Sequence, residues 1–152
     1  MKTFKEFNLS PALLTAVEAM GYTAPTPIQA QTLPLLLAGP TDFLGLAATG
    51  TGKTAAFGIP LLESLNNSRK EVQAVVLCPT RELALQVTEQ LNLLGKIKKI
   101  RAVPVYGGAG YGDQLRALRD GAQIVVATPG RLIDHLDRGT IKLDKVKTVV
   151  LD

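Results

Sequence analysis

The segment that decides the fold is Ala47-Ala48-Thr49-Gly50-Thr51-Gly52-Lys53-Thr54, which lies between an apolar run of strand length and a helical pattern. Ala47 stands where the phosphate-binding pattern GxxxxGKT has its first glycine, so a strict search for that pattern fails. Gly50 and Gly52 still allow positive φ, so backbone N–H groups and the positive end of the next helix can face a phosphate. Lys53 can reach the β- and γ-phosphates of a nucleotide, and the Thr54 hydroxyl can bind Mg²⁺. The alternative is a glycine-rich turn with an exposed lysine.

Apolar runs of strand length alternate with helical patterns on both sides of this segment. Such alternation predicts βαβ units, and hence an α/β fold with a mostly parallel sheet and helices on both faces. The β-branched residues of the last three runs suit fully buried strands. The expected strands are Phe43–Ala47, Val72–Cys78, Ile100–Tyr106, Ile124–Ala127 and Thr148–Leu151.

Helix start and stop signals divide the chain into two parts. Residues 1–39 form a helical segment, with one helix starting at Ser10-Pro11 and a second starting at Thr26-Pro27 that is kinked or broken near Pro34. We expect residues 40–152 to form part of a nucleotide-binding domain. Within it, apolar periodicity predicts helices over Arg81–Leu94, Asp113–Arg119 and Arg131–Asp137.

Length and composition exclude several classes of protein. The chain has 152 residues, of which 46% are hydrophobic and 20% charged, as in one folded domain and unlike a disordered or collagen-like chain. A single cysteine, Cys78, excludes an internal disulfide and favours the reducing cytoplasm. No stretch has the pattern of a signal peptide or a membrane span. The net charge of +4 permits a polyanionic partner without demanding one.

The chain stops at Asp152, directly after the predicted strand Thr148–Leu151. A carboxylate at the carboxyl end of a parallel strand lies where α/β proteins place their ligands, and it can hold Mg²⁺ through water. The alternative role for Asp152 is to cap a following helix. Because natural domains rarely end at such a strand, we expect a domain that is truncated after it.

Six short motifs stand in order along the chain: Gly21-Tyr22 with Pro25-Thr26-Pro27-Ile28-Gln29 (Q motif), Ala47–Thr54 (motif I), Pro79-Thr80-Arg81-Glu82-Leu83-Ala84 (motif Ia), Gly107-Gly108 (GG element), Thr128-Pro129-Gly130-Arg131 (motif Ib) and Val149-Val150-Leu151-Asp152 (opening of motif II). Over the whole chain this order resembles the first RecA-like domain of the bacterial DEAD-box RNA helicases. Alanine in the first loop position is the form of motif I in that family. The resemblance implies a RecA-like P-loop NTPase fold and ATP-dependent RNA helicase activity.

The resemblance implies an ATP site with Mg²⁺ as its cofactor. Tyr22 would stack on adenine, and the Gln29 amide would read the edge of the base. The spacing of Thr26 and Gln29 also fits a capping box, so a purely structural role for Gln29 stays open. Catalysis would rest on Lys53, Thr54 and Asp152, and Mg²⁺ would lie on Thr54 and, through water, on Asp152. The phosphates would lie on Ala48, Thr49, Gly50, Thr51, Gly52, Lys53 and Thr54.

Three strand-to-helix corners would form a surface for RNA. Two of the corners offer a capping threonine, free backbone N–H groups and a guanidinium, and the third offers glycine backbone without side chains. These groups suit phosphate oxygens. Contacts to phosphates do not distinguish one base from another. Ordinary helix capping is the alternative for each corner. By the resemblance, single-stranded RNA would contact Pro79, Thr80 and Arg81, Gly107 and Gly108, and Thr128, Pro129, Gly130 and Arg131.

The resemblance also implies a second RecA-like domain beyond the chain. It places the strand that follows Asp152 between Phe43–Ala47 and Thr148–Leu151, so we expect residues 1–152 alone to aggregate unless another chain or a rearranged strand fills the gap. The water-activating glutamate and the second domain's catalytic groups also lie beyond the chain, so we expect these residues alone to lack RNA-stimulated ATPase activity. Two other functions stay open, namely a nucleotide-dependent RNA clamp and another P-loop NTPase such as a DNA translocase. Outside the motifs, we expect His135 to be a solvated helix residue and Cys78 an inert core thiol.

Overall fold

Four short strands form one parallel sheet in the computed structural model, which describes residues 2–152. The order across the sheet is β2-β3-β1-β4, and the register sets Val75 opposite both Val125 and Val149. All four strands therefore end at one edge, called here the carboxyl edge, and the predicted parallel α/β sheet is confirmed. The strands are β1 Ala74–Leu77, β2 Ala102–Val105, β3 Ile124–Ala127 and β4 Thr148–Leu151.

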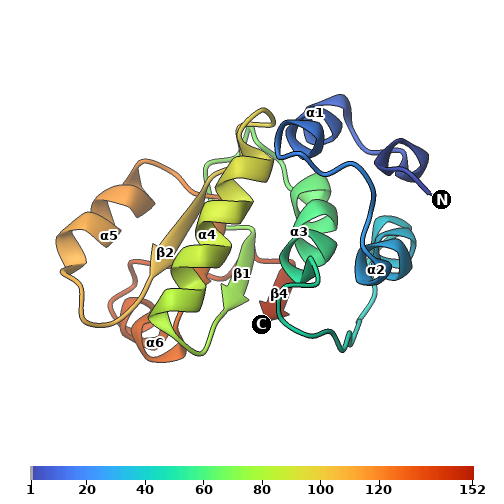
Figure 1. Cartoon of the computed structure of the whole chain (residues 1–152). Helices are drawn as coiled ribbons and strands as arrows, with labels where there is room; N and C mark the ends of the chain where they lie inside the picture. Colours follow the sequence, from blue (N-terminus) through green and yellow to red (C-terminus); the bar gives the residue numbers. More distant parts are fainter. Residues whose placement is uncertain (1) are drawn as a thin grey trace.

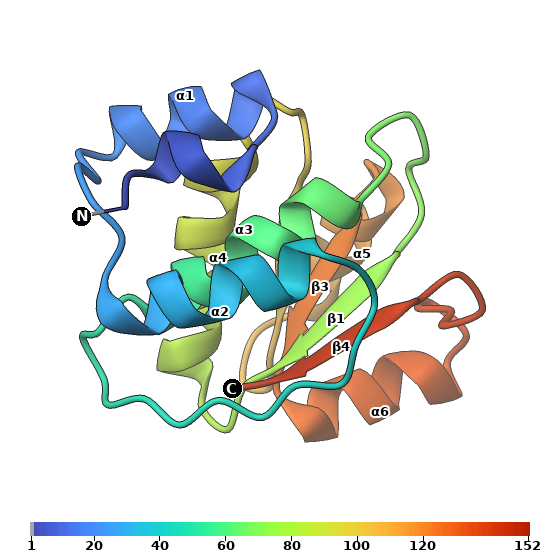
Figure 2. The same ribbon diagram turned by 90° about the vertical axis from the view of Figure 1, so that its right-hand side faces the viewer.

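Helices cover both faces of the sheet (Figures 1 and 2). One face carries α3 and α4, with α1, α2 and a short 3₁₀ helix packed outside them, and the opposite face carries α5 and α6. None of the helices within residues 2–152 is long and apolar enough to cross a membrane. The helices are η1 Phe4–Phe7, α1 Pro11–Ala19, α2 Pro27–Leu37, α3 Lys53–Ser64, α4 Arg81–Gly95, α5 Tyr111–Arg119 and α6 Pro129–Asp137.

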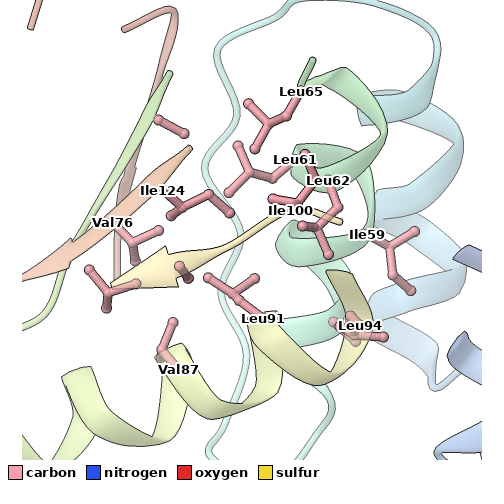
Figure 3. Close-up of a cluster of buried hydrophobic side chains, with 14 of the residues drawn as sticks. Ile59, Leu61, Leu62, Leu65, Val76, Val87, Leu91, Leu94, Ile100 and Ile124 are labelled. Atoms are coloured by element: carbon pink, nitrogen blue, oxygen red, sulfur yellow. The ribbon is translucent and has the colours of Figure 1, made fainter. Parts of the chain in front are cut away.

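The core is divided in two by the sheet, because alternate strand residues point to opposite faces. Val76 and Ile124 pack on the larger side against Leu62 of α3 and Leu91 of α4, and Figure 3 shows these side chains converging. Valines from the other side of the same strands form a second cluster with Leu132 of α6. Each such burial contributes about 1.5–3 kcal/mol, so the helices are held to the sheet mainly by apolar contact.

The predicted strand Phe43–Ala47 is wrong for this structure. This segment has no regular secondary structure, and Leu44 and Leu46 are 88% and 89% exposed. A strand needs a neighbour to satisfy its backbone groups. No strand within residues 2–152 pairs with this apolar run. The family resemblance implies a neighbouring strand that would follow Asp152.

A break at Pro34 is also wrong, since α2 runs without interruption from Pro27 to Leu37, and a kink there stays a prediction. Pro34 lies in the last turn of the helix, where its missing N–H removes one hydrogen bond and few residues follow. The other predicted helices are confirmed with small shifts of their ends. Thr26 and Pro27 begin α2 as expected, and Ser10 accepts a hydrogen bond from the Leu13 N–H at the start of α1.

Candidate nucleotide and RNA-binding site

The carboxyl edge gathers the predicted motifs on one side of the molecule. Motif Ia follows β1, the GG element follows β2, motif Ib follows β3, and Asp152 follows β4. In Figure 1 the chain terminus and the starts of α4 and α6 lie along the lower side of the sheet. This is the edge at which open parallel sheets bind ligands.

The phosphate loop, residues 48–54, has the backbone conformation that its glycines predict. Gly50 and Gly52 have φ of 79° and 83°, and Gly52 is the N-cap residue of α3. The Thr51 hydroxyl donates to the Ala48 carbonyl at 2.5 Å and closes the turn. A side chain at position 52 would also collide with the Gln29 amide. Glycine is therefore required there twice, for its conformation and for space.

Lys53 and Asp152 form an ion pair across this loop. Lys53 Nζ lies 2.8 Å from Asp152 Oδ1, and the lysine side chain is 39% exposed whereas that of the aspartate is 2% exposed. Asp152 Oδ2 is buried and has no hydrogen-bond partner within residues 2–152. An unpaired buried carboxylate oxygen is costly, so this atom is suited to a ligand.

The oxygen atoms of Asp152 and Thr54 are of a kind that binds Mg²⁺. The Asp152 carboxylate and the Thr54 hydroxyl are hard oxygen ligands, and Mg²⁺ in nucleotide sites uses one or two such protein groups with phosphates and water. The described part of the chain holds no cluster of three or more His, Cys, Asp or Glu side chains able to hold a metal. The remaining ligands would therefore have to come from the nucleotide and water.

Gln29 joins α2 to the phosphate loop. Its Oε1 accepts from the Thr26 N–H at 3.0 Å, while the Gln29 N–H donates to Thr26 Oγ1, so the capping box is present. Gln29 Nε2 also donates to the Gly52 carbonyl at 3.0 Å, a contact that the spacing did not predict. Tyr22 is half-buried, with its ring 6.5 Å from that of Phe4. The capping role is thus confirmed, and adenine recognition by Gln29 and Tyr22 stays a prediction.

The motif Ia corner presents an exposed arginine beside a capped helix. Thr80 Oγ1 accepts from the Leu83 N–H at 3.2 Å, so the capping of α4 expected here is confirmed. Arg81 is exposed, and its guanidinium lies 4.9 Å from the centre of the Tyr106 ring. The tyrosine at the end of β2 therefore holds the motif Ia arginine beside the GG element.

The motif Ib corner differs from the prediction in two respects. The Thr128 side chain makes no capping hydrogen bond, unlike Ser10 and Thr26, which cap α1 and α2 ahead of a proline in the same first position. The Arg131 side chain is only 11% exposed, because its Nη1 donates to the Ala109 carbonyl at 3.0 Å. Its guanidinium also lies 4.2 Å from the centre of the Tyr111 ring.

The GG element is bare backbone. Gly107 and Gly108 are exposed, Gly108 has a φ of 81°, and an added Cβ at either position would meet nothing within 4 Å. Open glycine backbone between two arginine corners allows the close approach of a sugar-phosphate chain.

The prediction for His135 is wrong. Its side chain is 0% exposed and hydrogen-bonds to Gln114 and Thr140. Burial, followed by the nearby charges of Arg131 and Arg138, lowers the pKa of His135 below its usual value of 6.5. Its spacing from Leu132 could have indicated this burial, because His135 lies about one helical turn after that buried leucine and thus on the inner face of α6. The partner Gln114 gave no signal in the sequence.

Two other residues outside the motifs have local roles. Cys78 is buried, and burial, with a further effect of the Asp152 charge, raises its pKa to about 11, as suits an inert thiol. Lys98 donates to the Leu62 and Glu63 carbonyls at 2.6 and 2.9 Å, at the carboxyl end of α3. That lysine stabilises a helix terminus.

Comparison with known proteins agrees with this geometry. Residues 26–152 match the family model for the DEAD/DEAH box helicase. The chain belongs to this family. It is 53% identical over 150 residues, 99% of its length, to the DEAD-box ATP-dependent RNA helicase CshA of Bacillus subtilis, and 52% identical over its full length to the CshA of Geobacillus kaustophilus. It spans 30% and 32% of these two relatives, so most of their length lies outside it.

Solved structures of the family share the fold. A DEAD box protein from the hyperthermophile Methanococcus jannaschii superposes with a TM-score of 0.90 at 42% identity, covering 99% of this chain and 41% of that one. Dbp5 of Saccharomyces cerevisiae bound to RNA and ADP BeF3 gives 0.90 at 37% identity, covering all of this chain and 38% of that one. The predicted RecA-like fold is therefore confirmed.

Proposed function

We propose that the chain is the ATP- and RNA-binding part of an ATP-dependent RNA helicase that acts in the cytoplasm. The observation that carries the proposal is the carboxyl edge, where a phosphate loop with its lysine and a buried aspartate lies beside three corners suited to phosphates. Relatives named as RNA helicases, and a structural neighbour solved with RNA and ADP BeF3, support it.

ATP would bind across the phosphate loop. Lys53 would leave its ion pair with Asp152 to neutralise the β- and γ-phosphates, and Gln29 with Tyr22 would hold adenine. The Thr54 hydroxyl and, through water, the Asp152 carboxylate with its unpaired Oδ2 atom would hold Mg²⁺. When bound, Mg²⁺ would supply charge stabilisation at the transferring phosphoryl group.

RNA would bind as a single strand through its backbone. The exposed guanidinium of Arg81, the open backbone of Gly107 and Gly108, and the first turn of α6 from Thr128 to Arg131 offer donors to phosphates. None of this chemistry reads bases, so binding would be independent of sequence. A second RecA-like domain in the full-length protein would complete the ATP site and separate short duplexes locally.

Steady-state ATPase activity of the full-length protein tests the proposal. We expect turnover that rises with single-stranded RNA of any sequence and does not rise with single-stranded DNA. Equal stimulation by DNA would instead favour a DNA translocase. ATP turnover without separation of a short RNA duplex would favour a nucleotide-dependent clamp.

A further inference from the structure

A chain of buried polar groups runs from α6 to the GG element, and His135 lies at its centre. His135 Nε2 is 2.9 Å from Gln114 Oε1, and His135 Nδ1 is 2.7 Å from Thr140 Oγ1. Gln114 is 6% exposed, so its amide depends on these internal partners. The His135 ring also lies 4.9 Å from that of Tyr111, on the same side of α5.

The partners determine the tautomer of this histidine. Gln114 Nε2 is used as a donor to the Tyr106 carbonyl at 2.9 Å, so Gln114 Oε1 faces the imidazole as an acceptor. His135 Nε2 must therefore carry the hydrogen and donate it to Gln114. The neutral ring then accepts at Nδ1 from the Thr140 hydroxyl at 2.7 Å, so the single hydrogen of that hydroxyl is used there and not on the His135 carbonyl at 3.1 Å.

Gln114 contacts groups that hold both ends of the GG element. Its Nε2 holds the Tyr106 carbonyl, directly before Gly107. Its Oε1 lies 3.4 Å from Arg131 Nη1, and the same Nη1 donates to the carbonyl of Ala109, directly after Gly108. Gly107 and Gly108 have no neighbours within 4 Å of where a Cβ would lie. The hydrogen bonds to the Tyr106 and Ala109 carbonyls therefore restrain the loop on either side of them.

We propose that His135 is a positioning residue for RNA binding, which through Gln114 and Arg131 holds the GG and motif Ib corners in one fixed arrangement. The inference rests on the proposed function, since it concerns how the same RNA surface is built. His135 would not touch RNA. It would fix the bare Gly107-Gly108 backbone so that no ordering cost is paid when a phosphate binds.

A role in packing alone would not need an imidazole. Leucine would fill a similar buried volume on α6, but it would leave the Gln114 amide without its donor and free to turn. Glutamine at position 135 would keep a side-chain N–H for that amide. The pair H135L and H135Q therefore separates packing from positioning.

The test measures two affinities in the full-length protein. The first is the affinity for a single-stranded homopolymer RNA at saturating non-hydrolysable ATP analogue, over a range of salt concentrations. The second is the affinity for that analogue without RNA. The variants are H135L, H135Q, Q114L and the double variant H135L/Q114L. The control is I133A, which alters a 56% exposed side chain on the same helix.

We expect H135L to weaken RNA binding about three- to tenfold and to leave its salt dependence unchanged, because the variant adds an ordering cost and removes no charged contact to a phosphate. H135Q and I133A should stay within about twofold of wild type, and the double variant should be no weaker than Q114L alone, since both changes break one path. Analogue affinity without RNA should be unchanged in all variants.

Three results would overturn the inference: RNA affinity of H135L within about twofold of wild type, additive losses in the double variant, or a parallel loss of analogue affinity, which would indicate general unfolding. Failure of the proposed function looks different, because wild type itself would then bind no RNA.

Discussion

The two halves of the carboxyl edge are built in opposite ways. In the RNA half, Arg131 is paired with the Ala109 carbonyl and Gln114 with the Tyr106 carbonyl, although the buried Tyr111 hydroxyl has no hydrogen-bond partner in the described residues. In the nucleotide half, Lys53 has one partner, Asp152, whose second oxygen has none in the described residues. Internal hydrogen bonds thus hold the backbone beside the GG element, whereas Lys53 and Asp152 keep their charges available for a compact polyanion.

The nucleotide half should respond most strongly to substitution. K53A removes a charge-assisted hydrogen bond worth about 1.5–3 kcal/mol, so we expect affinity for ATP·Mg²⁺ to fall about ten- to a hundredfold in the full-length protein. Equilibrium titration measures this, with K142A, an exposed lysine outside the site, as the control. An unchanged dissociation constant in K53A would contradict the assignment of residues 48–54 as a phosphate-binding loop.

The RNA half should lose affinity in a salt-dependent way. R81Q removes one exposed guanidinium, so we expect all single-stranded RNAs to bind about tenfold more weakly, with a salt slope smaller by roughly 0.7. R119Q, at the opposite end of α5 from the carboxyl edge, is the matched control. Loss of affinity for one RNA sequence only would show that bases are read and would contradict the backbone model.

A third variant tests the contact between α2 and the phosphate loop. Q29E keeps the acceptor for the Thr26 N–H but loses the donor to the Gly52 carbonyl, and it sets a carboxylate against that oxygen. We expect ATP affinity to fall about three- to tenfold and stability by about 1–3 kcal/mol. Thermal melts and titration check both, with Q31E on the exposed side of α2 as the control. Equal ATP affinity with lowered stability would limit Gln29 to a structural role.

The smallest effect concerns pH. The pKa of His135 is lowered in the folded state by burial and by Arg131 and Arg138, against Asp134, which acts in the other direction. Thr140, and Gln114 and Tyr111 of α5, are the other groups that face the ring. The unfolded chain then binds the proton more tightly, so this contribution to stability is complete well above pH 6.5 and is lost as the pH falls from 6.5 toward the folded pKa.

The slope of that loss is at most about 1.4 kcal/mol per pH unit. The melting temperature of wild type relative to H135Q, followed from about pH 7.5 to 5.5, measures it. A difference that does not change with pH would show that His135 is not buried as a neutral group.

Local patterns predicted most of the fold and the motif positions. Parallel strands such as Ile124–Ala127 were visible because buried β-branched runs stand out, and α4 because its apolar stripe and Thr80 cap are local features. Phe43–Ala47 was not predictable in this way, since a strand depends on a neighbour that its own residues do not encode.

Only part of the candidate site was predicted, because sequence patterns show local features and not contacts between distant segments. The loop residues 48–54 and Asp152 carry their chemistry in their own side chains and order. Other side chains of the site act through contacts between segments far apart in the sequence, namely Gln114, His135, Tyr106 and Tyr111. No local sequence pattern distinguishes a glutamine or tyrosine with such a role from one that is exposed to solvent.

Cross-titration of K53A and R81Q in the full-length protein tests whether the carboxyl edge is divided into a nucleotide half and an RNA half. Each variant is titrated with ATP·Mg²⁺ in the absence of RNA and with single-stranded RNA in the absence of nucleotide. We expect K53A to lose ATP affinity with RNA affinity within about twofold of wild type, and R81Q to do the reverse. Loss of both affinities in both variants would contradict the division of the carboxyl edge into a nucleotide half and an RNA half.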